Sequence, residues 1–503
     1  MAVSNIFVAC CSVLVALAYY LLHINSRLKK TPKEVAAVTC KPWTNEFVRD
    51  AYEKYRNKED DFKKYLPPKQ DRRYIVFGGS GLVGGWIVEH LVLRGQDPNA
   101  IRIADIQAPR RQRAVEHNVP YFKTDVTDVS SVAKVFDHPW ASEHANLPLT
   151  VFYTVAYIHA GLRKADLLPR FMKVNVDGTR NAVNAARSAG CDIFIVTSSV
   201  SIAMKPVNLL FAPWKEYPDN FVQFSDNAEP DDLEGPLEDF PGCYAYSKAR
   251  AEKLVRDADD NKANFRTGAI RPGHAIYGHG DANPSSVVYD YLRRGGMPTY
   301  VLPTVRIFGT LTCQTSWLSN FDLQLVSAQN VSLAHLLFEA RIHSQDLGGR
   351  VYAVTDDMKN PFKYGDLYRF LEGTAHPTTP IKFPVAGAVP IVLMAHLIEI
   401  YSSMQRRYLR FLPDVRGDLA ILQPALFNYS TVNIVYDDSK ARDELGYTGT
   451  GTLEGLSFQV REWNEEVEAK LAAGKAESKV QKDVQDTKLV DSNVPVAPEG
   501  VAR

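Results

Sequence analysis

The sequence lacks the features that mark a metal-binding, disulfide-rich or nucleic-acid-binding protein. Its six cysteines are scattered among 503 residues, with no CxxC pair and no Cys/His cluster. We therefore predict neither a disulfide framework nor a zinc or other metal site, which suits a reducing compartment. Lys plus Arg and Asp plus Glu both total 58. A chain without net charge gives no electrostatic reason to expect nucleic acid as a partner.

Charge is also missing from one stretch near the N-terminus. Residues 6–24 read IFVACCSVLVALAYYLLHI and contain no Asp, Glu, Lys or Arg. About 20 such residues allow a helix to cross the hydrocarbon layer of a membrane. Tyr19 and Tyr20 lie near one end of the run, where aromatic rings favour the membrane interface, and basic residues follow from Arg27 on.

A cleaved signal peptide is the competing interpretation of residues 1–30. Such a peptide needs positive charge before its apolar stretch and small residues at a cleavage site after it. Here the charges come after the stretch, and residues 26–29 read Ser-Arg-Leu-Lys. We therefore predict a retained single-pass anchor, and the positive-inside rule places the rest of the chain in the cytosol.

The remainder of the chain divides by composition. Residues 31–72 are polar and contain two consecutive prolines, which predicts a stem between anchor and folded domain. Beyond them, β-rich runs alternate with amphipathic helical stretches, a pattern typical of a parallel sheet covered by helices on both faces. We predict an α/β fold, a Rossmann-type doubly wound parallel sheet, over residues 73–280. A smaller substrate-binding region with interleaved elements follows over residues 281–463, and residues 464–503 form a disordered tail. The predicted strands are Tyr74–Phe77, Ile101–Ala104, Val151–Val155, Ile193–Val196 and Arg266–Ile270.

A second apolar stretch lies at residues 385–401. Pro390, His396 and Glu399 interrupt it, which disfavours a full membrane crossing. We predict a membrane-associating segment that lies on the bilayer. A lid over an apolar pocket and a buried core helix stay open as alternatives.

A glycine-rich turn follows the first predicted strand. It reads Gly-Gly-Ser-Gly-Leu-Val-Gly-Gly over residues 78–85, and a helical pattern comes after it. Gly78 permits a sharp turn, Gly81 lets the backbone approach a pyrophosphate, and Gly84 lets the helix pack close to the sheet, while the helix N-terminus offers N–H groups to the phosphates. A strand before and a helix after the turn are the context in which this motif indicates dinucleotide binding. The predicted cofactor contacts here are Gly78, Gly81, Leu82, Val83 and Gly84.

Two acidic residues follow later strands. Asp105 ends the second strand, where a carboxylate bonds both ribose hydroxyls of NAD and repels the phosphate of NADP. Arg110 and Arg111 lie nearby and can hold that phosphate, so NADP stays open although the sequence favours NAD. Asp125, which precedes Val126, is placed to contact the adenine or else to cap the following helix.

A tyrosine and a lysine lie four residues apart in the run from Gly242 to Lys248, which reads GCYAYSK. Residues four apart share one face of a helix. A lysine ammonium beside a phenol favours the phenolate, so we predict that Lys248 lowers the pKa of Tyr244 towards the working pH. Tyr244 then serves as an acid/base for a hydroxyl or carbonyl group.

Hydroxyl side chains follow the strand that ends at Val196. Thr197, Ser198 and Ser199 come directly after it. Ligands of open α/β sheets bind at the carboxyl ends of the strands, where one of these hydroxyls can bond the reacting oxygen. A helix cap or a satisfied polar turn is the alternative.

The order of these motifs resembles that of the extended short-chain dehydrogenases/reductases. The motifs are the glycine loop, the acidic strand end, Asp125-Val126-Thr127-Asp128, Asn175-Val176-Asp177-Gly178-Thr179, Thr197-Ser198-Ser199, Tyr244-x-x-x-Lys248 and Arg271-Pro272. Within that superfamily the chain is similar to the 3β-hydroxysteroid dehydrogenase group, which includes the sterol-4α-carboxylate 3-dehydrogenases. The stretches that carry this second likeness are Asn330–His335 and Asp437–Tyr447, and the resemblance spans residues 73–463.

The resemblance implies a role for each site residue. It implies Ser199 as the catalytic serine, Tyr244 as the acid/base, Lys248 as the residue that lowers its pKa and binds the nicotinamide ribose, and Pro272 as a further cofactor contact. It also implies oxidation of the 3β-hydroxyl of a sterol-like substrate by NAD or NADP at the endoplasmic reticulum membrane, with or without loss of a C-4 carboxylate, and it allows a homodimer. The chain departs from the family at residues 278–281, which read Gly-His-Gly-Asp where the family has proline second.

Two other functions stay open at this point. Another extended short-chain enzyme, such as a reductase of small ketones or a nucleotide-sugar epimerase, would carry the same cofactor and catalytic motifs. A non-catalytic dinucleotide sensor in the membrane would not need Tyr244 and Lys248. The anchor and the apolar segment favour a lipid-like substrate over these alternatives.

Overall fold

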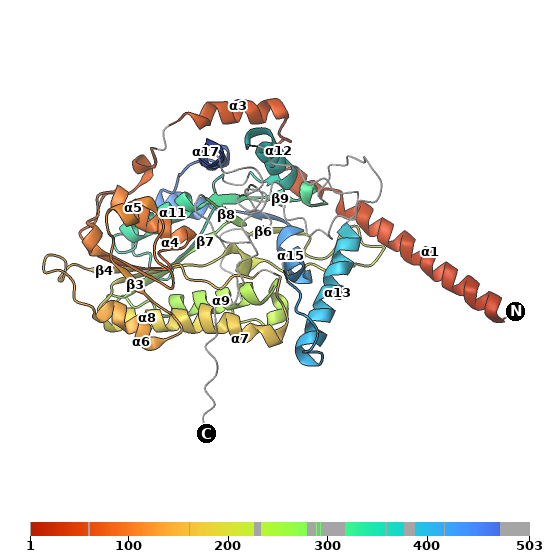
Figure 1. Cartoon of the computed structure of the whole chain (residues 1–503), viewed down its shortest axis with the longest axis horizontal. Helices are drawn as coiled ribbons and strands as arrows, with labels where there is room; N and C mark the ends of the chain where they lie inside the picture. Colours follow the sequence, from red (N-terminus) through yellow and green to blue (C-terminus); the bar gives the residue numbers. More distant parts are fainter. Residues whose placement is uncertain are drawn as a thin grey trace, which may run out of the picture.

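A sheet with helices around it forms the centre of the fold (Figure 1). Its seven parallel strands lie in the order β11-β7-β5-β4-β1-β2-β3. The computed structural model describes residues 2–58, 61–159, 161–225, 233–278, 288, 292, 317–357, 360–376, 388–416 and 418–472. The strands are β1 (Arg73–Phe77), β2 (Ile101–Asp105), β3 (Tyr121–Lys123), β4 (Leu149–Tyr153), β5 (Ile193–Thr197), β7 (Arg266–Pro272) and β11 (Val351–Val354). The five strands predicted from the sequence are all present, and their ends differ from the prediction by at most two residues.

Apolar side chains cover both faces of this sheet. In β1, Tyr74 and Val76 pack into a core on one face, and Ile75 and Phe77 pack into a core on the other. This follows from the two-residue period of a strand. Near-continuous apolar strands are typical of parallel sheets with helices on both sides, so the predicted doubly wound α/β fold is confirmed.

Two layers of helices complete those cores. The first layer contains α4 (Leu82–Leu93), α11 (Ala328–Arg341) and α16 (Ser439–Leu445). The second contains α6 (Val129–Asp137), α8 (Gly178–Ser188) and α9 (Cys243–Asp257). Since α11 and β11 come from the chain after residue 281, that region interleaves with the Rossmann sheet. The strand order reverses between β1 and β4, which places the ligand crevice at their carboxyl ends.

The remaining elements share a further apolar core. Within the described residues, short sheets pair β6 (Val222–Ser225) with β13 (Asn433–Tyr436), β8 (Ala275–Tyr277) with β10 (Leu325–Ser327), and β9 (Asp322–Leu323) with β12 (Phe362–Lys363). The helices around them are α12 (Tyr364–Thr374), α13 (Ala388–Arg407), α15 (Pro424–Ser430) and α17 (Thr452–Ala472). The boundary predicted at residues 280 and 281 lies outside the described residues, as does the part of the predicted tail after residue 472.

The polar stem folds back onto the body of the protein. It forms α2 (Lys33–Ala36), α3 (Asn45–Arg56) and η1 (Phe62–Tyr65), and α3 packs against α12 and α17. The ring of Trp43 stacks on Phe362 with 4.8 Å between centroids, and its backbone N–H donates to Asp366 at 2.9 Å. Buried apolar residues such as Val48 hold the stem in place, so within the described residues it is an ordered strap against the domain.

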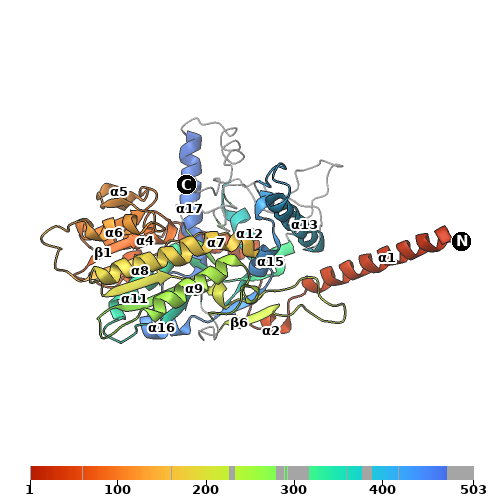
Figure 2. The same ribbon diagram turned by 90° about the horizontal axis from the view of Figure 1, so that it is seen from below.

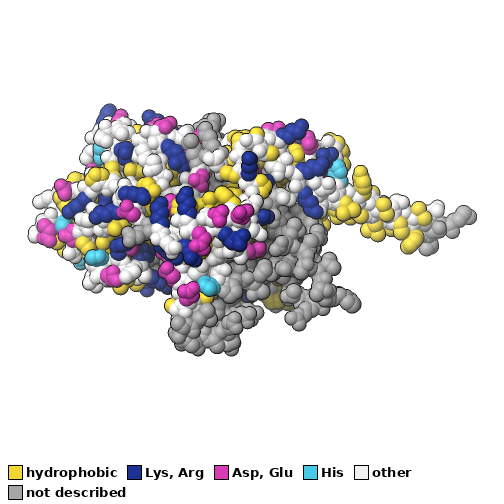
Figure 3. All heavy atoms as spheres, turned by 90° about the horizontal axis from the view of Figure 1, so that it is seen from above, with side chains coloured by type: hydrophobic (Ala, Val, Ile, Leu, Met, Phe, Trp, Pro, Cys, Tyr) yellow, Lys and Arg dark blue, Asp and Glu magenta, His cyan; other side chains and the backbone are white. Residues whose placement is uncertain are grey.

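Helix α1 (Ala2–Leu28) projects from the body in two perpendicular views (Figures 1 and 2). Its last turns are docked, because Ile24 and Leu28 are buried and the Tyr20 hydroxyl donates to the carbonyl of Phe211 at 2.8 Å. In Figure 3 the coloured side chains of the projecting part are hydrophobic, whereas charged side chains of both signs are scattered among other residues on the face of the body that is shown. Within the described residues, one apolar segment, Asn5–Ala36, is long and apolar enough to cross a membrane, with a mean hydropathy of 2.2.

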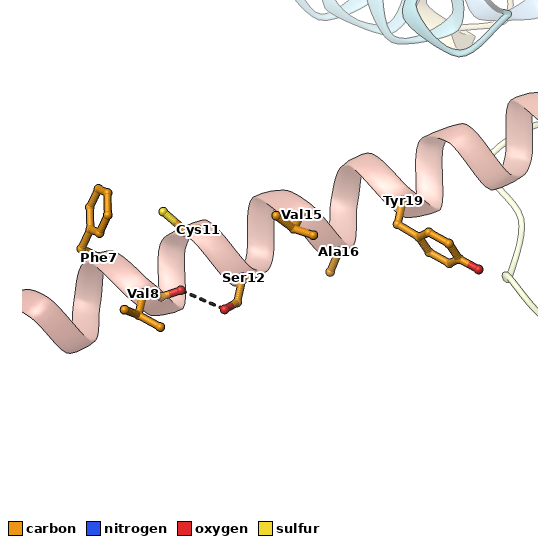
Figure 4. A pocket seen from close by; sticks show the side chains of 7 residues that line it. All are labelled: Phe7, Val8, Cys11, Ser12, Val15, Ala16 and Tyr19. Carbon is orange, nitrogen blue, oxygen red and sulfur yellow. Dashed lines mark hydrogen bonds between the residues drawn. The ribbon is translucent and has the colours of Figure 1, made fainter.

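The hydroxyl of Ser12, in the projecting part of α1, is satisfied within the helix. Figure 4 shows Ser12 among apolar neighbours, and its hydroxyl donates to the carbonyl of Val8 at 2.9 Å. A helix in hydrocarbon needs this arrangement, because no water is there to bond a free hydroxyl or backbone group.

Helix α13 contains most of the second apolar stretch, and residues 385–387 of that stretch lie outside the described residues. Val392, Ala395 and Ile398 face the core and are buried. Leu397 and Ile400 are exposed, at 61% and 55%. The helix is therefore a core element on one face, as one alternative had it, and an apolar surface on the other. That this surface lies on a bilayer stays a prediction.

Candidate active site

The glycine loop joins β1 to α4 at the reversal point of the strand order. Gly78 has φ +77°, a conformation that favours glycine. A Cβ on Gly84 would lie 2.2 Å from the Gly78 carbonyl oxygen, so this helix can approach the strand only without a side chain there. A Cβ on Gly81 would meet only that same oxygen, at 3.2 Å, which leaves the outer side of the loop open. No side chain of the described residues caps α4, so the N–H groups of Leu82 and Val83 can receive a pyrophosphate.

Asp105 lies at the end of β2, directly beside this loop. One carboxylate oxygen accepts the backbone N–H of Ser80 at 3.1 Å, and the other accepts that of Gln107 at 3.1 Å. Burial raises the pKa of Asp105, and these N–H groups oppose that effect. The carboxylate is thereby held against the glycine loop, where a cofactor ribose would lie.

Arg110 and Arg111, the two residues that could hold the phosphate of NADP, lie close to the same loop. The Arg111 guanidinium stacks 4.2 Å from the centre of the Trp86 ring on α4. Arg110 is exposed and donates to Gln107 at 3.4 Å. Asp105, in contrast, bonds the glycine loop directly, through the backbone N–H of Ser80.

Asp125 does not cap a helix, so that alternative is wrong. Its carboxylate accepts the backbone N–H and the hydroxyl of Thr127, at 2.9 and 2.8 Å, which closes a local turn. Asp128 caps α6 instead, because its carboxylate accepts the N–H of Ser130 at 2.9 Å. Asp125 itself is exposed, and the neighbouring Val126 is buried against Gly178.

Tyr244 is the second residue of α9, next to the hydroxyl of Ser199. Ser199 follows β5 and caps the 3-10 turn η5 (Val200–Ala203), so the cap alternative for this hydroxyl is correct as well. Burial raises the pKa of Tyr244 to about 12, and a hydrogen bond with Ser199 lowers it in part. The structure thus brings Tyr244 and Ser199 together at the carboxyl edge of the sheet.

Lys248 lies one turn after Tyr244, and its ammonium group is bonded to a backbone carbonyl rather than to the phenol. Its ammonium group donates to the carbonyl of Thr197 at 2.5 Å. Burial lowers the pKa of Lys248 to about 8, and the carboxylate of Glu252 opposes this. In the protein alone, burial is the larger influence on the pKa of Tyr244 and raises it. That Lys248 lowers this pKa stays a prediction for the cofactor-bound enzyme.

Thr197 and Ser198 are committed to a buried network behind Lys248. Ser198 donates to Glu252 at 2.6 Å, and Arg271 donates to the same carboxylate at 2.8 Å. The hydroxyl of Thr197 bonds His335 Nε2 at 2.9 Å. Of the three consecutive hydroxyls, Ser199 is the one left beside Tyr244. Pro272 directly follows Arg271. It is the last residue of β7 and is buried.

Asn175 is a supporting residue to which the sequence reasoning gave no role. It lies in the π-helical turn η4 (Met172–Asp177), and its amide donates to Ser247 at 2.8 Å and to the Tyr157 carbonyl at 3.1 Å. Such turns widen a helix and often occur at functional sites. Here the turn ties α9 to the loop after β4. The signal for this role in the sequence was an asparagine, a polar residue, within a predicted helical stretch.

A doubly wound sheet with this loop and these side chains at its carboxyl edge is the architecture of the extended short-chain dehydrogenases/reductases. The solved structure of gox2253 has the same fold, with a TM-score of 0.50 and 19% identity over 78% of this chain and 98% of that one. The family model described as 3-beta hydroxysteroid dehydrogenase/isomerase matches residues 75–384, and the chain belongs to this family. It is an oxidoreductase that acts on CH–OH groups with a nicotinamide dinucleotide, NAD or NADP, as acceptor.

Named relatives agree at modest identity. Sterol-4-alpha-carboxylate 3-dehydrogenase, decarboxylating, of Mus musculus is 25% identical over 76% of this chain and 88% of its own length. The Homo sapiens protein of the same name is 26% identical over 68% of this chain and 79% of its own length. 3beta-hydroxysteroid-dehydrogenase/decarboxylase isoform 2 of Arabidopsis thaliana is 25% identical over 75% of this chain and 59% of its own length.

Proposed function

We propose that this protein oxidises the 3β-hydroxyl of a sterol-like substrate to a ketone, using NAD. The observation that carries the proposal is that Ser199 and Tyr244 lie together at the carboxyl edge of the sheet whose strand β1 leads into the glycine loop. The family and the names of the relatives support a sterol as the substrate. Asp105 supports NAD over NADP, since a carboxylate at this place repels a ribose phosphate.

The residues present fit a dinucleotide and an alcohol. Gly78, Gly81 and the first turn of α4 would hold the pyrophosphate, and Lys248 would hold the nicotinamide ribose. The oxidised nicotinamide supplies a hydride acceptor for the carbinol hydrogen. Ser199 binds the reacting oxygen, and Tyr244 takes its proton as the carbon–oxygen double bond forms.

The phenol must ionise for that step, although burial raises the pKa of Tyr244 to about 12. Two positive charges can lower this pKa when cofactor is bound: the Lys248 ammonium and the oxidised nicotinamide ring. Tyr244 is therefore set up to become a base only in the presence of cofactor. Without cofactor the phenol stays neutral, so the enzyme avoids the free-energy cost of a buried charge.

A carboxylate beside the reacting carbon would extend the reaction. Oxidation then yields a β-keto acid, whose C–C bond to the carboxylate breaks with release of CO2 and formation of an enol. The enol takes up one proton to give the ketone. The relatives named as decarboxylating support this second step.

We place the enzyme on the endoplasmic reticulum membrane, with α1 as a single-pass anchor and the catalytic domain in the cytosol. Helix α13 contacts α1 and turns an apolar stripe outward. The stripe consists of Leu393, Leu397, Ile400, Tyr401 and Met404, and Tyr408 and Phe411 continue it. Arg406 and Arg407 follow on the last turn, where cations meet lipid headgroups. A lipid-soluble alcohol would reach the site from this side.

The test is NADH formation by the full-length enzyme in membranes, across sterols with and without a C-4 carboxylate. We expect NADH and a 3-ketone from 3β-hydroxysterols, and CO2 in addition from the carboxylated ones. Turnover of a nucleotide sugar without net NADH would establish an epimerase instead. Dinucleotide binding without turnover of any alcohol would establish a sensor.

A further inference from the structure

Residues 208–217, which we call the base loop, connect η5 to β6 and pack against the last turns of α1. The hydroxyl of Tyr20 on α1 donates to the carbonyl of Phe211 at 2.8 Å. Leu209 and Phe211 are buried in the same apolar core as Ile24 of α1. The base loop is therefore attached to α1 where that helix meets the body.

The far end of the base loop lies further along the same helix. Burial raises the pKa of Tyr217, and the charge of Arg27 on the last turn of α1 opposes this, which places the two side chains near each other. Tyr20 and Arg27 are seven residues apart, which corresponds to about 10 Å along a helix. The polar interface on each side of a bilayer is roughly 5–8 Å thick. The base loop thus follows α1 over a length similar to the thickness of that interface.

Trp214 lies at the tip of the base loop. The backbone N–H of Lys215 donates to the carbonyl of Ala212 at 3.0 Å, which closes a tight turn around Pro213 and Trp214. Residues 209–214 contain no charged side chain, and Trp214 is 82% exposed. An uncharged, apolar tip is thus exposed beside the base of α1.

Exposure alone does not assign a role to Trp214, because single exposed apolar side chains are common on protein surfaces. The position of the tip is the second argument. Its loop is fixed to a helix whose outer part is apolar and exposed, up to Leu17 and Tyr19 just before the docked turns. Tryptophan is enriched at membrane interfaces, because its ring is largely apolar while the indole N–H finds a polar partner there.

We propose that the base loop contacts the interface of the bilayer that α1 crosses, with Trp214 inserted among the lipid headgroups. This inference rests on the membrane placement of α1 in the proposed function and adds a second contact to it. The charges of the base loop begin only after the tip, where Lys215 pairs with Asp219 at 2.7 Å. Lys29 and Lys30, which follow α1, are exposed on the same side of the membrane and meet the headgroups there.

A second contact restricts how the body sits on the membrane. A single spanning helix leaves the body free to rotate and tilt about it. Since the base loop and the last turns of α1 share one apolar core, the depth of α1 also sets the depth of Trp214. The body is then held at one height and orientation above the bilayer.

The test is quenching of tryptophan fluorescence by phosphatidylcholine that carries bromine on its acyl chains. Helix α1 contains no tryptophan, so any quenching in vesicles comes from the rest of the chain. We expect bromine near the headgroup end of the chains to quench the full-length wild type, and bromine at the chain end to quench it less. Most of this quenching should be lost in Trp214→Phe. The matched control is Trp140→Phe, which should keep it, because the Trp140 ring stacks on the body against Arg102, 3.4 Å from its guanidinium.

Flotation of the same samples separates the possible outcomes. Equal quenching of the wild type and Trp214→Phe, in protein that floats with the vesicles, would overturn this inference and leave the anchor and the proposed oxidation in place. Stronger quenching by bromine at the chain end would place Trp214 in hydrocarbon and would also overturn it. Blue-shifted Trp214 emission without quenching by either lipid would show that protein covers the tip. Protein that does not float would remove the anchor and this inference together, whereas NADH formation would still test the oxidation.

Discussion

Glu399, halfway along α13, holds Arg163 of the loop after β4 through two hydrogen bonds of 2.9 Å. Lys164 lies 3.6 Å from the same carboxylate. The same loop also contacts the start of α9, because the carbonyl of Leu162 accepts the backbone N–H of Cys243 at 2.9 Å. One short segment thus connects the apolar helix with the helix that carries Tyr244. Glu399, which disfavoured a membrane crossing in the sequence, therefore links the apolar helix α13 to the proposed active site.

Glu399→Gln should weaken that link. Burial raises the pKa of Glu399, and Arg163 outweighs it, so the net pKa is lowered. The ion pair therefore stabilises the fold above the ordinary glutamate pKa, and this contribution disappears as the pH falls through the lower, folded-state value. At neutral pH we expect the variant to lose about 1–2 kcal/mol in chemical unfolding, a value reduced because the guanidinium is 36% exposed. KM for the sterol should also rise.

The control for this pair is Asp166→Asn. Asp166 joins the same segment to Arg406 of α13 at 3.3 Å, but both side chains are about a third exposed. Such a surface pair contributes about 0–1 kcal/mol, so stability and KM should change little. Equal effects of the two variants would contradict a special role for Glu399.

Tyr244→Phe should abolish most turnover and preserve cofactor binding. The phenol oxygen is the expected base, and losing a general base costs about 10²- to 10⁴-fold in kcat. NAD binding, measured by calorimetry, should stay within about twofold, since Lys248 and the glycine loop remain. Tyr246→Phe is the control, because that phenol lies on the same helix and accepts from Arg250 at 3.2 Å. Undiminished turnover by Tyr244→Phe would end the assignment.

Two glycine variants should separate folding from cofactor binding. In Gly84→Ala the new methyl would lie 2.2 Å from the Gly78 carbonyl, so the helix must shift and stability should fall by about 1–3 kcal/mol. In Gly81→Ala the nearest contact is 3.2 Å, so thermal unfolding should hardly change. Both should weaken NAD binding in a titration. Tight NAD binding by Gly81→Ala would show that the pyrophosphate does not approach this residue.

Asp105→Asn should shift the enzyme towards NADP. The amide keeps an oxygen for the N–H of Ser80 but removes the charge that repels a ribose phosphate. We expect the ratio of kcat/KM for NAD to that for NADP to fall about tenfold or more. Asp125→Asn is the comparison, since that side chain closes a local turn, and its ratio should stay constant. An unchanged ratio in Asp105→Asn would place the ribose elsewhere.

A photo-crosslinking amino acid at Leu397 should attach to lipid. Leu397 is 61% exposed on the outer face of α13, and Val129, which is 66% exposed on α6, is the control. After illumination of the full-length enzyme in vesicles, we expect lipid adducts from position 397 and none from 129. Cross-links between two copies of the chain at 397 would instead show that this stripe is a dimer interface.

Much of the fold was predictable because it rests on local patterns. Each buried strand of the central sheet is a short apolar run, and the turn after β1 needs glycine for its φ of +77°. The order of the motifs along the chain identified the family. Such features depend on neighbouring residues, which the sequence displays directly.

The chemistry of the site depended on contacts that no local pattern contains. Spacing placed Lys248 beside Tyr244, but the Thr197 carbonyl takes the ammonium and burial moves the phenol's pKa upward. Asp128 rather than Asp125 caps α6, because that choice depends on where the helix begins.

The sequence by itself determined the class of fold, the glycine turn after β1 and the family, and it singled out Tyr244 as the proposed reactive tyrosine. The tertiary structure alone decided that the stem packs on the body, that Glu399 is paired with Arg163, and that Asn428 of α15 bonds the Pro241 carbonyl before α9. The physical reason is the same in each case. A pKa, an ion pair and a buried hydroxyl are set by what packs around them, and those neighbours come from distant parts of the chain.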